Sequence, residues 1–511
     1  MESQSNSRTY NSKKNVSYGI IVTILSTLVA FVNRTFFVKC LGPEFLGLNS
    51  LFSEVITMLS LAELGVGMAI NYSLYKPIHE NNHQKINQLM SLFRKTYNYI
   101  ALVIFILGII LLPFVHLIVN GTHFDLSYIR WVFFLFVLNT STSYLFSYNT
   151  SFITADQKQY VVSLATAVMK VVFSAFTITI LVLFHNFIIY LILVILQTLA
   201  TNIYLTYYVR KRYPFINYQD KLPDSEKKKI FRDIKNIFIK RVSGVITSST
   251  TNVLISTLVS TIQVGFYSNY TIIFSVVRTL NKQFSNGIKA SIGDLTVSES
   301  PEKCIQILKR LTFMFFSFSM IVCSGLSALC SEFISLWLGQ EYVMMEIIVF
   351  VAIYNLFIEI CSEPLWQYLE VSGLFKQDRN IAILGSTVNL IVAIVLGYKI
   401  GIVGIFLGTM STQLIQIVLK SRLLFNSLFT TSSKDYLYYW LKMCAAFLLF
   451  LEFQHLINQY LVFNLWLLNF IIKGFLAVII SFGILFLLFY KSSEYNYSIS
   501  FVKGIIKNRE P

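Results

Sequence analysis

Charged residues are scarce in this sequence. Asp, Glu, Lys and Arg make up only 13% of its 511 residues, whereas 55% are hydrophobic. Soluble globular domains carry about 25% charged residues, so this composition excludes a soluble enzyme or a soluble binding module. Most of the chain is therefore expected to lie in a lipid bilayer.

Cysteine is also rare. The six cysteines are scattered, mostly in apolar segments, with no CxxC pair and no histidine at metal-ligand spacing, a pattern that argues against a metal centre. The sequence also lacks a Walker loop, a GxSxG or HExxH motif, and a paired-aspartate motif. We therefore predict that the chain is not an enzyme and holds no metal and no cofactor.

Long apolar runs recur along the whole sequence. A helix needs about 20 mostly apolar residues to cross the hydrocarbon core of a bilayer. Runs of this kind lie at about 16–38, 46–74, 96–119, 127–150, 160–183, 186–209, 242–262, 266–291, 311–330, 344–367, 380–399, 402–425, 437–457 and 465–489. The sequence thus predicts an all-α integral membrane protein with about 14 transmembrane helices.

The basic residues give these helices an orientation. Lys and Arg outnumber Asp and Glu by 41 to 25. They concentrate in the even-numbered loops, whereas the odd-numbered loops carry few besides Lys39 and Lys399. Because short basic loops stay in the cytoplasm, we expect a multi-pass protein of the bacterial cytoplasmic (inner) membrane with both termini cytoplasmic. The basic excess then requires no nucleic acid.

A long basic connection suggests two halves. It spans 210–241 and separates a six-helix lobe, 1–209, from a second six-helix lobe, 242–425, and two extra helices and a cytoplasmic tail follow at 426–511. The second helices of the two halves share Phe and Gly positions. We therefore expect pseudo-symmetric lobes related by an axis along the membrane normal, with a binding site between them.

Within the basic connection, apolar and basic residues alternate at helical spacing. The apolar set is Ile230, Phe231, Ile234, Ile237 and Phe238, and the basic set is Lys227, Lys228, Lys229, Arg232 and Lys235. Such an amphipathic helix suits the surface of an anionic inner leaflet. The alternative is an ordinary solvated linker helix.

Three glycine-containing motifs carry a family resemblance. They are LGPEFLGLN at 41–49, LAELGVGMAI at 61–70 and GIVGIFLGT at 401–409. Gly42 and Pro43 form a tight turn, and Gly47, Gly65 and Gly67 allow close helix packing, as do Gly404 and Gly408. The first two motifs resemble the amino-terminal signature of the polysaccharide flippases, the Wzx group of the multidrug/oligosaccharidyl-lipid/polysaccharide exporter superfamily.

The resemblance implies a MATE-like, two-lobed fold that opens alternately to each side of the membrane. The substrate would be an oligosaccharide on a polyprenyl diphosphate, moved from the inner to the outer leaflet for capsule or another surface polysaccharide. The partners would be this lipid, membrane lipids, and a polysaccharide polymerase and glycosyltransferases. The alternatives are a MATE-type multidrug exporter and, with less support because the outer loops are short, a membrane glycosyltransferase or polymerase.

Cations inside the predicted helices are the candidate substrate contacts. Arg278, Lys282 and Lys289 fall within roughly 40° of one another on one helix and form a cationic stripe. A substrate diphosphate could neutralise this stripe; the alternative is that the two lysines snorkel to the cytoplasmic edge. Arg34, near the outer surface, and Lys170, near mid-membrane, could line the same cavity, with snorkelling an equal alternative for Arg34.

Acidic residues inside the helices could balance these cations or bind a coupling H⁺ or Na⁺. Glu54 and Glu63 lie on nearly opposite faces of one helix and cannot form a site together. Glu359 and Glu363 share a face, one turn apart, just before Pro364, where the helix could bend. Salt bridging to Arg278 or Lys170 is the favoured use of these two acids, and an ion site is the alternative.

Overall fold

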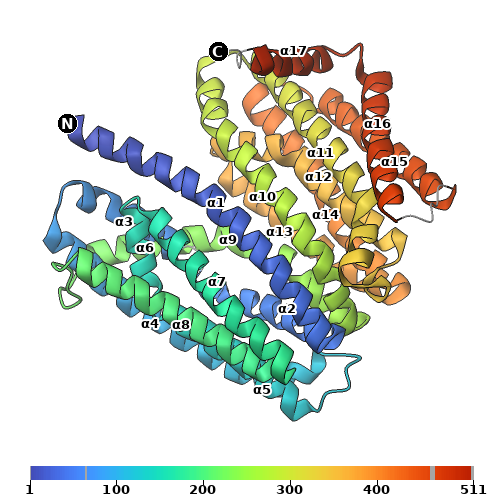
Figure 1. The fold of residues 1–511 in the computed structure, drawn as a ribbon. Helices are drawn as coiled ribbons and strands as arrows, with labels where there is room; N and C mark the ends of the chain where they lie inside the picture. Colours follow the sequence, from blue (N-terminus) through green and yellow to red (C-terminus); the bar gives the residue numbers. More distant parts are fainter. Residues whose placement is uncertain (1, 64–65, 461–465, 508–511) are drawn as a thin grey trace. The chain divides into compact units, whose positions relative to one another are not determined.

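The computed structural model describes residues 2–63, 66–460 and 466–507 (Figure 1). Every regular element in those residues is a helix, which confirms the predicted all-α class. Two compact units divide the chain, Met1–Gly265 and Phe266–Pro511. Ten of the described helices are long and apolar enough to cross a membrane, or eleven if one bent pair is a single span. The exact count of 14 stays a prediction.

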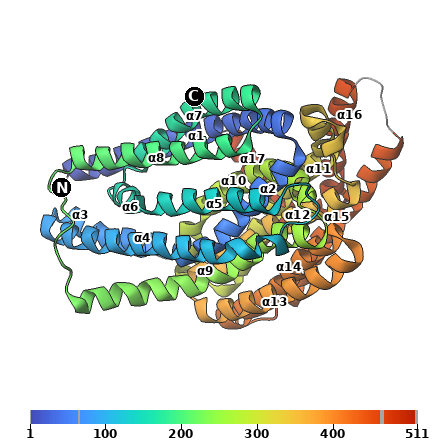
Figure 2. The ribbon, with the colours of Figure 1, turned by 90° about the horizontal axis from the view of Figure 1, so that it is seen from below.

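The amino-terminal unit is built from long helices laid side by side. α1 packs along α7, α7 along α8, α8 along α5 and α5 along α4 (Figures 1 and 2). Its elements are α1 (Glu2–Leu41), α2 (Pro43–Leu59), η1 (Ser60–Glu63), α3 (Val66–His79), α4 (His83–Leu111), η2 (Leu112–Leu117), α5 (Leu126–Tyr144), α6 (Ser147–Ala155), α7 (Gln159–Phe184), α8 (Phe187–Arg212) and α9 (Asp224–Leu258).

The carboxyl-terminal unit packs α13 against α14, and α11 against both α12 and α16. α10 (Thr261–Ser298) enters this unit from the first one. The remaining elements are α11 (Pro301–Leu338), η3 (Gln340–Tyr342), α12 (Glu346–Val371), α13 (Phe375–Ile400), α14 (Ile402–Leu424), the π-helical turn η4 (Phe425–Phe429), α15 (Lys434–Tyr460), α16 (Trp466–Phe489) and α17 (Ser493–Lys507).

Two predicted single helices are interrupted. The run at 46–74 forms α2, the 3₁₀ turn η1 and α3, near two glycines that weaken a helix, Gly65 and Gly67. The run at 127–150 forms α5 and α6, with a bend of 43° between them. There the hydroxyls of Thr142 and Ser147 bond back to the carbonyls of Leu138 and Ser143, an arrangement that bends helices.

Glycine positions set the closest helix contacts, as predicted. Gly42 has φ +85°, a conformation that glycine adopts without strain, and it starts α2. A Cβ at Gly47 would lie 2.1 Å from the carbonyl oxygen of Thr261, and one at Gly404 would lie 2.2 Å from that of Leu396. These glycines therefore let α2 approach the start of α10, and α14 approach α13. Gly65 lies outside the described residues.

The helical part of the basic connection, at the start of α9, packs against the rest of the amino-terminal unit. Ile230 is buried and Ile234 is partly buried, both in the apolar cluster that α4 and α6 form with Phe93 and Phe152. α9 then continues without a break to Leu258. At these two positions the packing favours the ordinary-linker alternative over a membrane-surface helix. The side chains of Ile237 and Phe238 lie outside the described ones.

Candidate functional site

The charged side chains of α10 face those of α12 in the carboxyl-terminal unit. Both Glu359 carboxylate oxygens accept from Nε of Arg278, each at 3.0 Å. About three turns further along α10, Nζ of Lys289 lies 2.9 Å from Oε1 of Glu370. The acids of α12 therefore neutralise two of the three cations in the predicted stripe.

A hydrogen-bond cluster around Glu363, with neutral donors, lies between these two ion pairs. The Ser285 hydroxyl donates to the Glu363 carboxylate, and the Gln367 amide donates to both Ser285 and Glu363, the latter at 2.9 Å. Ser285 and Gln367 are buried. Glu363 thus meets neutral donors, and no cation lies within ion-pair distance of it among the described side chains.

Lys282 differs from its two neighbours in the stripe. It is exposed, and in the described part of the chain no carboxylate lies within ion-pair distance of it. The paired groups are also accessible, since the side chain of Arg278 is 43% exposed and that of Glu359 is 39% exposed. An anion that approached this face would therefore find in Lys282 an exposed cation without an acidic partner in the described chain.

The register of the two helices explains why these groups meet. On α12 the residues Glu359, Glu363, Gln367 and Glu370 recur at intervals of three and four, so they share one face. On α10 the cations Arg278, Lys282 and Lys289 are separated by four and seven residues, so they also share one face. Sequence reasoning identified Glu359 and Glu363 but missed Gln367 and Glu370, and the continuation of this spacing was the signal that could have found them. α12 runs through Pro364 as one helix.

Arg34 and Lys170 lie in the amino-terminal unit. Nζ of Lys170 donates to the backbone carbonyl of Ser26 at 3.1 Å, which ties α7 to α1. Arg34, on the same helix α1, lies close to Tyr190 of α8. Both cations therefore have contacts within their own unit, and neither side chain is fully exposed.

Glu54 and Glu63 occupy different elements, α2 and the 3₁₀ turn η1. A Cβ at Gly67 would lie 3.1 Å from Oε1 of Glu63 and 3.2 Å from the Tyr97 hydroxyl. Glu63 is therefore in a crowded environment near α4.

The ion pair of the buried Lys473 was missed by the sequence reasoning. Nζ of Lys473 lies 2.7 Å from Oε1 of Glu332, and the Asn469 amide donates to the same oxygen at 2.8 Å. The Lys473 side chain is only 7% exposed, so it does not snorkel to the membrane surface. No signal at Lys473 itself distinguished it from a snorkelling lysine, because its acidic partner lies on a distant helix.

Metal-ligating side chains do not gather in the part of the chain that the structure describes. Among the described residues, no group of three or more His, Cys, Asp or Glu could hold a metal ion. The five cysteines other than Cys40 are buried.

Comparisons with known proteins agree with this architecture. A family model described as "Polysaccharide biosynthesis protein" matches residues 12–281. A search of curated protein sequences gives no significant match. The solved structure of the lipid II flippase MurJ, in an inward closed conformation, is similar with a TM-score of 0.64 and 17% identity, covering 92% of this chain and 99% of that one.

Multidrug transporters share the same fold. An inward-facing MATE family transporter of the MOP superfamily gives a TM-score of 0.56 at 14% identity, over 80% of this chain and 96% of that one. A mutant of the Vibrio cholerae MATE transporter VcmN gives 0.54 at 13% identity, over 83% of this chain and all of that one. These solved structures are of flippases and transporters, and at identities of 13–17% their similarity shows a shared fold.

The family match extends from α1 into α10 and covers more than half of the 511 residues. The predicted resemblance to polysaccharide flippases is thereby confirmed at the level of the family, and the MATE-like fold is confirmed by the solved structures. The chain belongs to the polysaccharide biosynthesis protein family and is a multi-pass membrane protein with the fold of the MOP superfamily.

Proposed function

We propose that this protein is a flippase that moves a polyprenyl-diphosphate-linked oligosaccharide from the inner to the outer leaflet of a bacterial cytoplasmic membrane. The product would serve capsule or another surface polysaccharide, and glycosyltransferases and a polymerase would act before and after transport. The family match carries the proposal, and the exposed cations of α10 supply its chemistry.

The α10–α12 face fits a diphosphate ligand. Ionised groups inside a membrane are costly unless they face water, a partner or a ligand. Lys282 is exposed without an acidic partner in the described chain, and Arg278 and Lys289 are bound to carboxylates that an incoming diphosphate could replace. We infer that the diphosphate binds Lys282 and replaces Glu359 as the ion-pair partner of Arg278. Binding and release by such an exchange need no nucleotide.

Glu363 is the better candidate for ion coupling. Glu359 is neutralised by Arg278, whereas Glu363 is bound by the neutral groups of Ser285 and Gln367. A coupling ion could bind Glu363 without displacing a partner cation, because its neighbours in this cluster are neutral donors. We therefore expect Glu363→Gln to weaken the dependence of transport on an H⁺ or Na⁺ gradient, whereas Glu359→Gln acts through Arg278.

Complementation of a deletion strain tests the proposed flippase function. The readouts are polyprenyl-diphosphate oligosaccharide in lipid extracts and polymer at the cell surface. We expect complete lipid-linked repeat units to accumulate in the deletion strain, with wild type and Lys376→Glu, an exposed lysine on α13, restoring the polymer. Lys282→Glu, which makes the same change of charge on α10, should restore less than a tenth as much.

A charge swap separates substrate binding from folding. Arg278→Glu alone should lower the abundance of the protein in the membrane. Arg278→Glu combined with Glu359→Arg should recover this abundance, because the ion pair is rebuilt with reversed polarity.

If no lipid-linked sugar accumulates in the deletion strain and the polymer is unchanged, the substrate assignment is wrong.

A multidrug exporter is the second candidate. Three acids of α12, Glu359, Glu363 and Glu370, equal in number the three cations of α10, so this face is less cationic than the stripe alone suggests. Increased sensitivity of the deletion strain to organic cations, without a change in lipid-linked sugars, would favour this candidate.

A further inference from the structure

A groove between α4 and α5 in the amino-terminal unit combines an apolar wall with one arginine. It is a cavity of about 390 Å³ lined by Ile109, Leu112, Ser127, Arg130, Trp131 and Phe134. The two helices meet closely beside it, where a Cβ at Gly108 would lie 2.4 Å from the Val137 side chain. The groove thus opens next to that contact, with a volume in the range of about 300–1,000 Å³ that is typical of ligand sites.

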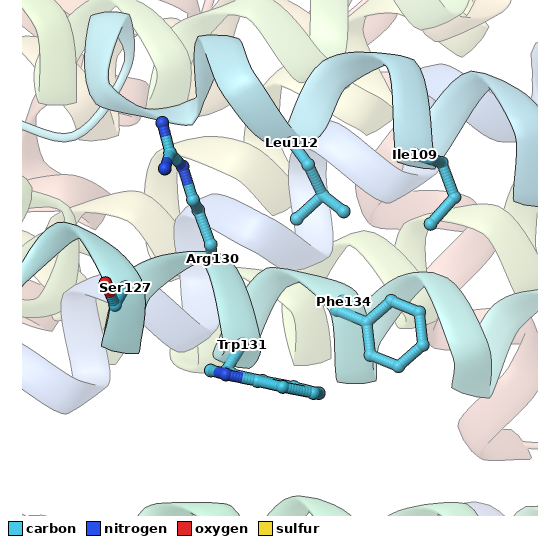
Figure 3. Close-up of a pocket in the computed structure, with 6 residues that line it drawn as sticks. All are labelled: Ile109, Leu112, Ser127, Arg130, Trp131 and Phe134. Carbon is cyan, nitrogen blue, oxygen red and sulfur yellow. The ribbon is translucent and has the colours of Figure 1, made fainter.

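Arg130 is incompletely bonded in this groove. Its Nε atom is buried and has no hydrogen-bond partner, and within the described residues no carboxylate lies within ion-pair distance of it. Figure 3 shows the Arg130 side chain rising from α5 toward the ribbon that carries Leu112. A buried guanidinium nitrogen without an acceptor is costly, so an acceptor from outside the protein would satisfy it.

The rest of the lining suits a hydrocarbon chain. Ile109 and Leu112 point from the α4 side toward the groove, and Trp131 and Phe134 extend from α5 (Figure 3). The Trp131 side chain is 63% exposed, and its ring packs edge-on against that of Phe134 at 5.8 Å. On a membrane-spanning helix such exposed apolar groups contact lipid.

The height of Arg130 matches a lipid phosphate. Arg130 is four residues from the start of α5 at Leu126, which places it about 6 Å along the helix. The charge distribution places this end of α4 and α5 at the outer surface of the membrane. Tryptophan at such a level lies at the boundary between headgroups and acyl chains.

We propose that the α4–α5 groove binds an anionic phospholipid, with the phosphodiester accepting hydrogen bonds from Arg130 and an acyl chain lying against Trp131 and Phe134. A phosphodiester carries one negative charge, and among the described residues Arg130 is the one charged residue that lines the groove. A polyprenyl diphosphate carries more charge and would need more cations. The site is therefore separate from the α10–α12 face and does not depend on the proposed function.

Native mass spectrometry of the purified full-length protein tests this site. The probes are phosphatidylglycerol, phosphatidylethanolamine with the same chains, and polyprenyl diphosphate. We expect wild type to retain phosphatidylglycerol in preference to phosphatidylethanolamine, and Arg130→Gln to bind phosphatidylglycerol about tenfold less, since a charge-assisted bond is lost. Arg130→Lys should keep part of the binding, because a lysine retains the charge without the bidentate geometry.

Lys39→Gln is the matched control. Lys39 is an exposed cation at the end of α1, so its loss removes the same charge from the same unit without altering the groove. Equal phosphatidylglycerol binding by Arg130→Gln and Lys39→Gln would overturn the proposal, and so would displacement of phosphatidylglycerol by an equimolar amount of polyprenyl diphosphate.

Tryptophan fluorescence locates the lipid independently. Phosphatidylglycerol with brominated chains should quench the emission of wild type more than that of Trp131→Phe, and Arg130→Gln should remove this difference. Unchanged elution and unfolding temperature of Arg130→Gln would show that it is folded. If Arg130→Gln is folded and the Trp131 contribution to quenching persists, the lipid does not depend on Arg130 and the proposal fails.

Discussion

Lys420 and Lys473, two lysines of the carboxyl-terminal unit, are buried with an acid close by. Nζ of Lys420 lies 2.9 Å from Asp378 and 3.9 Å from the ring centroid of Trp366. Lys473 is bound to Glu332 between α16 and α11. A buried charge that loses its partner is left without compensation. Replacing one member of such an ion pair is therefore expected to lower the stability of the protein more than replacing both.

We predict that Lys473→Met destabilises the protein by about 3–5 kcal/mol, because Glu332 loses its cation in a largely buried position. The combined change Lys473→Met and Glu332→Met should be milder, since it removes both charges. Thermal unfolding of the purified protein measures the difference, with Lys399→Met, an exposed lysine on α13, as the control. A double variant less stable than the single one would contradict this account of the pair.

At the scale of elements, glycines decide which helices touch. A Cβ at Gly265 would lie 2.8 Å from the Pro43 carbonyl oxygen and 2.9 Å from the Gly47 nitrogen. α2 and the first turns of α10 are therefore in direct backbone contact. Backbone atoms cannot move aside as a flexible side chain can, so a methyl group there must separate the two helices.

We predict that Gly265→Ala and Gly47→Ala each lower the amount of folded protein in the membrane at least threefold, because overpacking of this kind costs about 1–3 kcal/mol. Gly483→Ala is the control, since a Cβ at that position meets nothing within 4 Å. Fluorescence-detected size exclusion of tagged protein gives the measurement. Similar profiles for all three variants would show that α2 and α10 can separate without cost.

The segment after α8 is fastened to α4 by hydrogen bonds. The Asn87 side chain donates to the Phe215 carbonyl at 3.0 Å and accepts from the Asn217 amide at 3.1 Å. Nearby, the Tyr213 hydroxyl donates to Asp156 and accepts from Lys158. Burial and the Asp156 carboxylate raise the pKa of Tyr213, so its hydroxyl stays a donor. Residues 213–218 are thus held in place by polar contacts.

We predict that Asn87→Ala loosens this segment, because two backbone groups lose a buried partner at a cost of about 1–3 kcal/mol. Hydrogen–deuterium exchange should accelerate in residues 213–222, with little change in α7. Thr96→Val, which removes a bond within α4 itself, should leave the segment protected. Unaltered exchange in Asn87→Ala would mean that the apolar contacts of Ile230 and Tyr213 suffice.

At the scale of the whole molecule, the distribution of basic residues predicts the topology. We expect a green fluorescent protein fused after residue 507 to fluoresce, because that end is predicted to be cytoplasmic. Alkaline phosphatase fused near Glu341, in the connection between α11 and α12, should be active, because that connection is predicted to lie outside. The reciprocal fusions serve as controls. An inactive phosphatase near Glu341 together with a fluorescent fusion at 507 would mean that the α11–α12 connection does not lie outside. The predicted alternation of cytoplasmic and outer loops would then be wrong.

Much of the architecture follows from local sequence properties. Apolar runs of span length predict helices because an isolated helix satisfies its own backbone hydrogen bonds in lipid. Glycine motifs such as LGPEFLGLN predict close packing, which Gly47 confirms. The breaks at η1 and between α5 and α6 were not predicted, because a hydropathy window does not register helix-weakening glycines or the serine and threonine side chains that bond back to backbone carbonyls.

The sequence by itself determined the fold class, the membrane setting and the cations of α10, since composition and helical periodicity are local properties. Only the tertiary structure decided the partners of those cations, because Arg278 and Glu359 are far apart along the chain. It also decided that Lys473 is buried and that Arg130 lies in an apolar groove. Which helices pack together depends on the sum of many contacts, and no single stretch of sequence contains that sum.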